Sequence, residues 1–209
     1  MNLISDCCFG AYVYRDYLKI EYQNPFIWSS ILLKDMVSLI KNYSAINFSK
    51  VKLIRFCDHV SADFFCGDTF MLSQYNSLTG LEVDGKFKVF WTHNYYDPTA
   101  AVPKKLGGEV YYCKNYLYTV NNWFKRMPRM ANAGKPVFSL ITQKNKFGSV
   151  SEYKQLLNDC AEADIIMITS TKELLEFNTK NHRIYFNADV DRSPEFILRE
   201  MYKDINFIF

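Results

Sequence analysis

The sequence predicts one α/β domain over residues 1–209, built on a mixed sheet. In the C-terminal third, apolar runs alternate with amphipathic stretches, and this order is typical of parallel strand-helix units with right-handed crossovers. In the middle of the chain, apolar and polar residues alternate on both sides of Asp84-Gly85, which predicts an antiparallel hairpin. A length of 209 residues, with 49% hydrophobic and 22% charged residues, suits a single hydrophobic core.

The N-terminal quarter predicts two strands that flank two helices. Asn24-Pro25 interrupts the first helical stretch, because proline disfavours a helical conformation at the residue before it. Apolar residues then recur at i, i+3, i+4 and i+7, which indicates an amphipathic helix. In chain order we expect a strand over 2–5, a helix over 11–18, a turn over 25–30, a helix over 30–42 and a strand over 51–57.

The middle and the end of the chain follow from the same periodicities. Strands are expected within 71–77, 80–85 and 87–93, followed by a loop over 97–110 and a helix over 114–127 that Pro128 ends or kinks. The last third predicts strands over 136–142, 163–170 and 182–186, which alternate with helices over 151–163, 172–178 and 193–202.

Composition and charge exclude several classes of function. A net charge of +3 is too small, and too evenly spread, for a nucleic-acid partner. No run approaches the roughly 18 apolar residues that a membrane span needs. The N-terminus lacks a basic head and carries Asp6 early, so we expect a cytoplasmic protein whose six cysteines are reduced thiols. No nucleotide-binding or C-x-x-C pattern is present, so we expect neither a cofactor nor a metal.

A turn between the first strand and the first helix carries the strongest candidate for chemistry. Cys8 follows the strand and precedes Gly10. The free amides at a helix N-terminus favour a thiolate, and they would also stabilise an oxyanion. Gly10 would let a ligand approach the backbone closely. The alternative is a buried, structural cysteine, since cysteine is among the most buried residue types.

A cysteine nucleophile needs a base, and His93 is the candidate. It stands where a predicted strand ends, and Asn94 and Asp97 follow as candidates to orient its ring. The alternative is a polar cap on the strand end. The other two histidines are expected in a loop (His59) and at the surface (His182).

Two further patterns point to anionic ligands. Arg126 and Arg129, beside Trp123, would place two guanidinium groups against a phosphate or carboxylate. The alternative is an amphipathic helix with a solvated basic face. Asp189 and Asp191 form a D-x-D pattern that would hold a divalent metal and a nucleotide sugar, but acidic residues before a helix are commonly capping residues.

The first third of the chain resembles a bacterial family of exopolysaccharide-biosynthesis proteins, which carries a pattern like I-S-N-N-C-W-G-G followed by Y-N-S-P-F-I. Here the corresponding text is ISDCCFGAYVYRDY, then YQNPFIW. The matching positions are Cys8, Gly10, Asn24, Pro25 and Phe26, and the later W-x-x-R-x-x-R element corresponds to Trp123, Arg126 and Arg129. The layout is also similar to papain-like cysteine peptidases, with PFIW at 25–28, His93-Asn94 and the strand that begins KPV.

These resemblances imply an enzyme of bacterial surface-glycan biosynthesis, a transferase or hydrolase that uses Cys8 and His93 for acyl transfer or hydrolysis of a small-molecule or glycan-related substrate. Gly10, Trp28, Trp123, Arg126 and Arg129 would contact the ligand. One alternative is a glycosyltransferase-like or sugar-phosphate-binding protein in which Cys8 is structural. The second is a non-catalytic interaction module.

Overall fold

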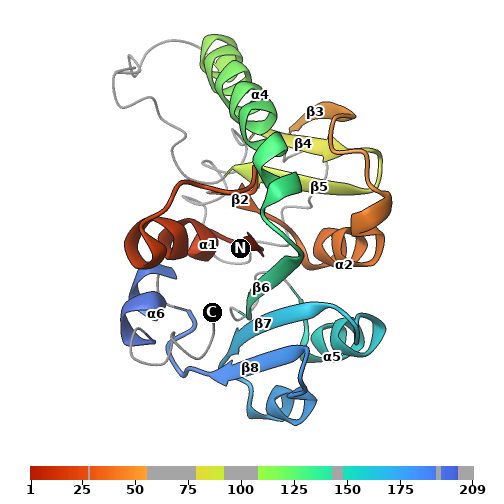
Figure 1. The fold of residues 1–209 in the computed structure, drawn as a ribbon, viewed down its shortest axis with the longest axis vertical. Coiled ribbons are helices and arrows are strands. Elements are labelled where there is room, and N and C mark those ends of the chain that lie inside the picture. Colours follow the sequence, from red (N-terminus) through yellow and green to blue (C-terminus); the bar gives the residue numbers. More distant parts are fainter. Residues whose placement is uncertain (28, 56–78, 92–107, 143–147, 192–193, 202–209) are drawn as a thin grey trace.

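The computed structural model describes residues 1–27, 29–55, 79–91, 108–142, 148–191 and 194–201, and within them it confirms the predicted α/β class. The strands form two four-stranded sheets, one parallel and one antiparallel (Figure 1). Several predicted features lie outside the described residues: the strand over 71–77, and the candidate site residues Trp28, His93, Asn94 and Asp97.

The parallel sheet confirms the architecture predicted for the C-terminal third, with a strand from the N-terminus added to it. Its order is β1 (Asn2–Ser5), β6 (Pro136–Thr142), β7 (Asp164–Thr169) and β8 (His182–Phe186), and every neighbouring pair is parallel. The two central strands, β6 and β7, are nearly continuous apolar runs, because helices cover both faces of a parallel sheet.

Helices from different parts of the chain cover the two faces (Figure 1). On one face lie α1 (Phe9–Tyr12), its continuation as a π-helix, η1 (Val13–Leu18), and α6 (Pro194–Glu200). On the other lies α5 (Val150–Asp159), which begins at a capping box formed by Ser149 and Glu152. The segment predicted as a helix over 172–178 is a 3₁₀-helix instead, η5 (Lys172–Phe177), and it ends at Phe177 because Asn178 is already extended.

The antiparallel sheet has the order β2 (Ser29–Ser30), β5 (Phe87–Trp91), β4 (Thr79–Val83) and β3 (Val51–Arg55). Asp84 and Gly85 both have positive φ, at 52° and 66°, which confirms the predicted hairpin turn. The strand β2 was not predicted, because two residues are too few to show a period.

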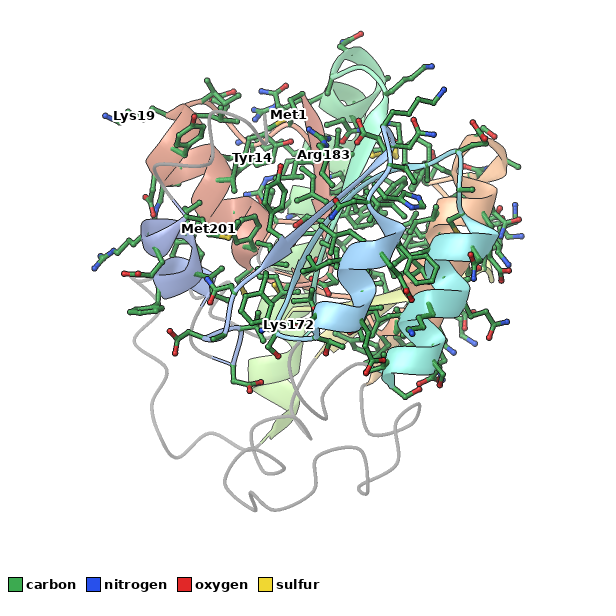
Figure 2. All side chains as sticks on the ribbon, turned by 90° about the horizontal axis from the view of Figure 1, so that it is seen from below. Met1, Tyr14, Lys19, Lys172, Arg183 and Met201 are labelled. Carbon is green, nitrogen blue, oxygen red and sulfur yellow. The ribbon has the colours of Figure 1, made fainter. Side chains whose placement is uncertain are left out.

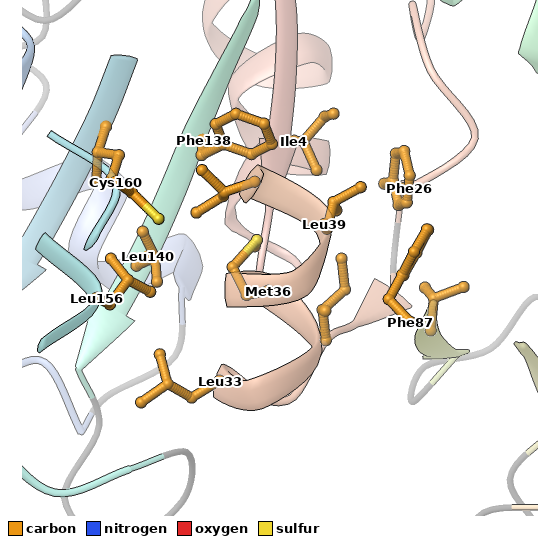
Figure 3. Packing of buried hydrophobic residues seen from close by; sticks show 14 of the residues in the cluster. Ile4, Phe26, Leu33, Met36, Leu39, Phe87, Phe138, Leu140, Leu156 and Cys160 are labelled. Atoms are coloured by element: carbon orange, nitrogen blue, oxygen red, sulfur yellow. The ribbon is translucent and has the colours of Figure 1, made fainter. Parts of the chain in front are cut away.

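The helix α2 (Leu33–Asn42) lies between the two sheets (Figure 3). It begins later than the predicted Ser30, because Ser29 and Ser30 pair with β5 instead. Met36 and Leu39 are fully buried in a cluster that includes Phe138 of β6 and Phe87 of β5. One apolar cluster therefore spans both sheets. A short 3₁₀-helix, η2 (Tyr43–Ala45), follows α2.

The longest helix, α4 (Gly108–Asn132), differs from its prediction at both ends. It begins at Gly108, within the segment expected to be a loop, and it continues four residues past Pro128. Proline has no amide hydrogen to donate to Phe124, so the helix tolerates one missing hydrogen bond there. No helix in the described parts of the chain has a stretch long and apolar enough to cross a bilayer.

Candidate functional site

The carboxyl edge of the parallel sheet contains a point where consecutive strands lead to opposite faces. The chain leaves β1 for α1 on one face and leaves the adjacent β6 for α5 on the other (Figure 1). Such a topological switch point is where α/β sheets usually bind ligands. Asp6, Cys7 and Cys8 follow β1 directly, so the predicted cysteine turn lies at this edge.

Asp6 ties three segments together at the switch point. Its backbone amide donates to the carbonyl of Ser139, and its carbonyl accepts from the amide of Ile31, each at 3.0 Å. Its carboxyl group accepts from the amide of Ile141 and so replaces the backbone acceptor that a longer β1 would have supplied. Burial raises the pKa of this carboxyl to about 7, against the lowering effect of the Ile141 hydrogen bond.

The two adjacent thiols differ in exposure. Cys8 stands directly before α1, as predicted, but it is buried, with 5% of its surface exposed. Cys7 is partly exposed, and its Sγ lies 4.0 Å from the hydroxyl of Ser5. Although part of the residue is exposed, desolvation of the thiol and the neighbouring Asp6 raise the pKa of Cys7 well above its usual value. The burial of Cys8 and the raised pKa of Cys7 both favour structural, protonated thiols over reactive thiolates at neutral pH.

Gly10 lies against β1. A Cβ at this position would stand 3.1 Å from the Cβ of Ser5, so glycine allows close packing of helix on strand. One turn later, the hydroxyl of Tyr14 donates to the carbonyl of Met1 at 2.9 Å and accepts from the amide of Leu3 at 2.8 Å. Figure 2 shows Tyr14 beside Met1. This junction is therefore tightly packed.

Of the three histidines, the structure describes His182. Its prediction as a surface residue is wrong: His182 is 3% exposed, and its Nε2 lies 3.2 Å from the carbonyl oxygen of Cys160. The pairing of Cys8 with His93 stays a prediction, since His93 lies outside the described residues. The last described backbone before it, at Trp91, pairs with Ser29.

A pocket of about 500 Å³ lies between the end of η1 and one face of α4. Most of its lining is basic, and it includes both arginines of the predicted anion site. The lining residues are Arg15, Lys19, Ile20, Glu21, Tyr22, Asn122, Lys125, Arg126 and Arg129.

The helical repeat explains why α4 supplies four of these residues. Asn122, Lys125, Arg126 and Arg129 are spaced i, i+3, i+4 and i+7, which places them on one face. Opposite them, Lys19 ends η1 with a left-handed φ of 54° and starts the extended segment that lines the other wall. Figure 2 shows Lys19 at the periphery of the molecule, pointing outward.

Contacts within the pocket orient two of its guanidinium groups. Arg129 lies 3.1 Å from the carboxylate of Glu21, and it donates to the carbonyl of Tyr22 at 3.1 Å. Arg126 lies over the ring of Tyr22, 5.1 Å from its centroid. Among the described residues, the amines of Lys19 and Lys125 form no ion pair. The pocket therefore combines positioned arginines with lysines open to an anion.

Trp123 does not line this pocket. Its side chain is fully buried, and its indole Nε1 donates to the carbonyl of Phe48 at 2.9 Å. It packs edge-on against Phe26, with ring centroids 5.4 Å apart. The aromatic residue beside the arginines is Tyr22 instead. Trp123 thus holds α4 on the core and presents the basic face outward.

Sequence reasoning missed Arg15, Lys19, Lys125 and Asp6. Lys125 and Arg129 are spaced i and i+4, as are Arg15 and Lys19, so the helical repeat could have grouped each set. Nothing in the sequence shows that these two sets meet. Asp6 had a local signal, because it directly follows a buried strand.

The D-x-D pattern does not join either region. Asp189 and Asp191 are exposed in the turn after β8, and no group of three His, Cys, Asp or Glu side chains able to hold a metal ion occurs within the described residues.

No protein-family model matches the chain, and no curated protein matches its sequence.

Proposed function

We propose that this protein binds a small phosphate-bearing molecule, such as a sugar phosphate of surface-glycan biosynthesis, in the pocket between η1 and α4. One observation carries the proposal: five basic side chains from two segments far apart in the sequence line one pocket, whose lining holds one carboxylate, Glu21. Arg15 pairs with Asp16 at 2.6 Å, beside the lining, so the other four cations carry most of the positive charge. In this reading Cys8 is structural, in keeping with its burial.

The dimensions and chemistry of the pocket suit such a ligand. Small-molecule sites commonly enclose about 300–1,000 Å³, a range that includes this pocket. The ring of Tyr22 and the side chain of Ile20, which is 44% exposed, offer apolar surface beside the charges. Guanidinium groups match the geometry of phosphate oxygens, and lysines add point charge.

Lysine substitutions test the proposal without disturbing the fold, because Lys19 and Lys125 hold no ion pair among the described residues. We expect glucose 6-phosphate to raise the melting temperature of the wild-type protein, and the double variant K19Q/K125Q to bind it about tenfold more weakly by calorimetry. The double variant K34Q/K52Q is the matched control, because it also removes two exposed lysines and both lie outside the pocket lining. Absence of binding by the wild type to any phosphate-bearing sugar would overturn the proposal.

A Cys-His enzyme of surface-glycan metabolism, acting by acyl transfer or hydrolysis, is the second candidate. The observation that favours it is the position of Cys7-Cys8 at the switch point of the parallel sheet. It requires Cys8 to become accessible as a thiolate and His93 to lie within reach.

Alkylation separates the two candidates. The enzyme proposal predicts that iodoacetamide modifies Cys8 faster than the other cysteines near neutral pH, as followed by peptide mass spectrometry. A structural Cys8 would react slowly in the folded protein. Slow, equal modification of all six cysteines counts against the enzyme.

A further inference from the structure

Glu21 occupies an unusual position, because it is the acidic residue in the lining of a basic pocket. Its carboxylate contacts the guanidinium of Arg129 at 3.1 Å, yet 78% of the Glu21 side chain is exposed. An exposed ion pair of this kind is weak and readily exchanged. Glu21 thus places a carboxylate where an anionic ligand would bind.

We infer that the pocket takes a phosphomonoester dianion, and that this ligand replaces the carboxylate of Glu21 on the guanidinium of Arg129. The inference rests on the proposed function and adds to it a class of ligand and a residue that sets affinity.

The competition favours a dianion over a monocarboxylate. Glu21 is tethered, so its effective concentration at Arg129 is on the order of millimolar. A monocarboxylate ligand would only replace one carboxylate by another on the guanidinium of Arg129, so it would gain little binding free energy at this contact. A phosphomonoester carries about −1.5 to −2 charges and three acceptor oxygens, so it can contact Arg129 and the neighbouring basic side chains together.

Arg129 stays in place when Glu21 leaves. Its Nη1 also donates to the backbone carbonyl of Tyr22, and that contact does not depend on the Glu21 carboxylate. The guanidinium of Arg126 lies over the Tyr22 ring and is held on the same wall of the pocket. Removing Glu21 therefore leaves the binding groups positioned.

The experiment measures binding of glucose 6-phosphate and of glucuronate by calorimetry in low salt. The proteins are the wild type, Glu21→Gln and Glu176→Gln. Glu176 is a matched control, because it is also an exposed glutamate in an ion pair, with Lys154, and it lies on η5 away from the pocket. Both substitutions change the net charge equally.

We expect the wild type to bind glucose 6-phosphate at least about tenfold more tightly than glucuronate, because of its second charge. Glu21→Gln should tighten phosphate binding about three- to fivefold, while Glu176→Gln leaves it unchanged. Equal affinities for the two ligands would overturn the ligand class. The role of Glu21 would be overturned if Glu21→Gln weakened phosphate binding, left it unchanged, or changed it no more than Glu176→Gln does. The proposed function would still stand in each of these cases. No binding by either the wild type or Glu21→Gln would overturn both.

Discussion

The carboxyl group of Asp6 accepts hydrogen bonds from the backbone amide of Ile141, at 3.1 Å to Oδ2 and 3.3 Å to Oδ1. Asp6 directly follows β1, and Ile141 belongs to β6, so this side-chain contact extends the pairing of the two strands beyond the end of β1. The residue Asp6 is 2% exposed, and burial raises the pKa of its carboxyl to about 7.

The burial of the Asp6 carboxyl makes stability dependent on pH, because burial raises its pKa while the hydrogen bond from Ile141 lowers it. Because the pKa of Asp6 is higher in the folded protein than its ordinary value of 3.8, folding favours the protonated form. The stabilisation is complete below pH 3.8 and is lost as the pH rises to about 7. The loss is on the order of 4 kcal/mol, since each pKa unit corresponds to about 1.4 kcal/mol.

The variant Asp6→Asn should remove this dependence, because an amide oxygen still accepts from Ile141 but carries no charge. We expect the free energy of unfolding of Asp6→Asn, relative to the wild type, to increase between pH 4 and pH 8, as measured by urea denaturation. Glu162→Gln, at an exposed position that holds no ion pair among the described residues, is the control. If the difference in free energy of unfolding between Asp6→Asn and the wild type does not change with pH, the raised pKa of Asp6 is contradicted.

Trp123 is predicted to matter for stability and not for ligand contact. Trp123→Ala should lower the free energy of unfolding by about 3–5 kcal/mol, because it leaves a large cavity at a fully buried site. Trp123→Phe should cost less and should keep the affinity for glucose 6-phosphate, since the side chain does not line the pocket. Weaker ligand binding by a well-folded Trp123→Phe would show a role that burial does not explain.

Gly80 is predicted to tolerate no side chain. A Cβ there would overlap the ring of Phe90 and stand 2.8 Å from the carbonyl oxygen of Val89 on the paired strand. We expect Gly80→Ala to destabilise the protein by about 1–3 kcal/mol through overpacking, measured by chemical denaturation.

Gly85 provides a useful comparison with Gly80. Its Cβ would meet nothing within 4 Å, but its φ is +66°. Gly85→Ala should therefore cost about 1–2 kcal/mol through backbone strain alone. The two variants together separate steric overlap from conformational strain, and a neutral Gly80→Ala would contradict the packing.

Arg126 is predicted to contribute directly to anion binding. Arg126→Ala should weaken glucose 6-phosphate binding about tenfold, because charge-assisted hydrogen bonds contribute roughly 1.5 kcal/mol or more. Lys172→Ala is the matched control, since Lys172 is also a cation over an aromatic ring, Phe186, on another element. Equal effects of the two substitutions in calorimetry would argue against a specific site.

Local patterns were sufficient to predict most of the regular structure. The strands β6 and β7 are bounded apolar runs, and the Asp84-Gly85 turn carries its own signal. The patterns failed where tertiary contacts decide: β2 exists because β5 lies beside it, and α4 continues through a residue that normally breaks helices.

The candidate site was harder to predict for a physical reason. Arg126 and Arg129 were identifiable from helical spacing, but Lys19 and Glu21 come from a segment about a hundred residues earlier. Their meeting depends on how η1 and α4 pack, which no periodicity records. The sequence placed Cys8 correctly before a helix, and its burial is likewise decided by packing.

The pairing of β1 with β6 has a consequence for how the chain acquires its structure. Asn2 is in register with Pro136, and the whole antiparallel sheet lies between them in the chain. Contacts of such long sequence separation slow folding, because a large loop must close first. During synthesis the first strand emerges early, and it must wait for most of the polypeptide before its partner exists.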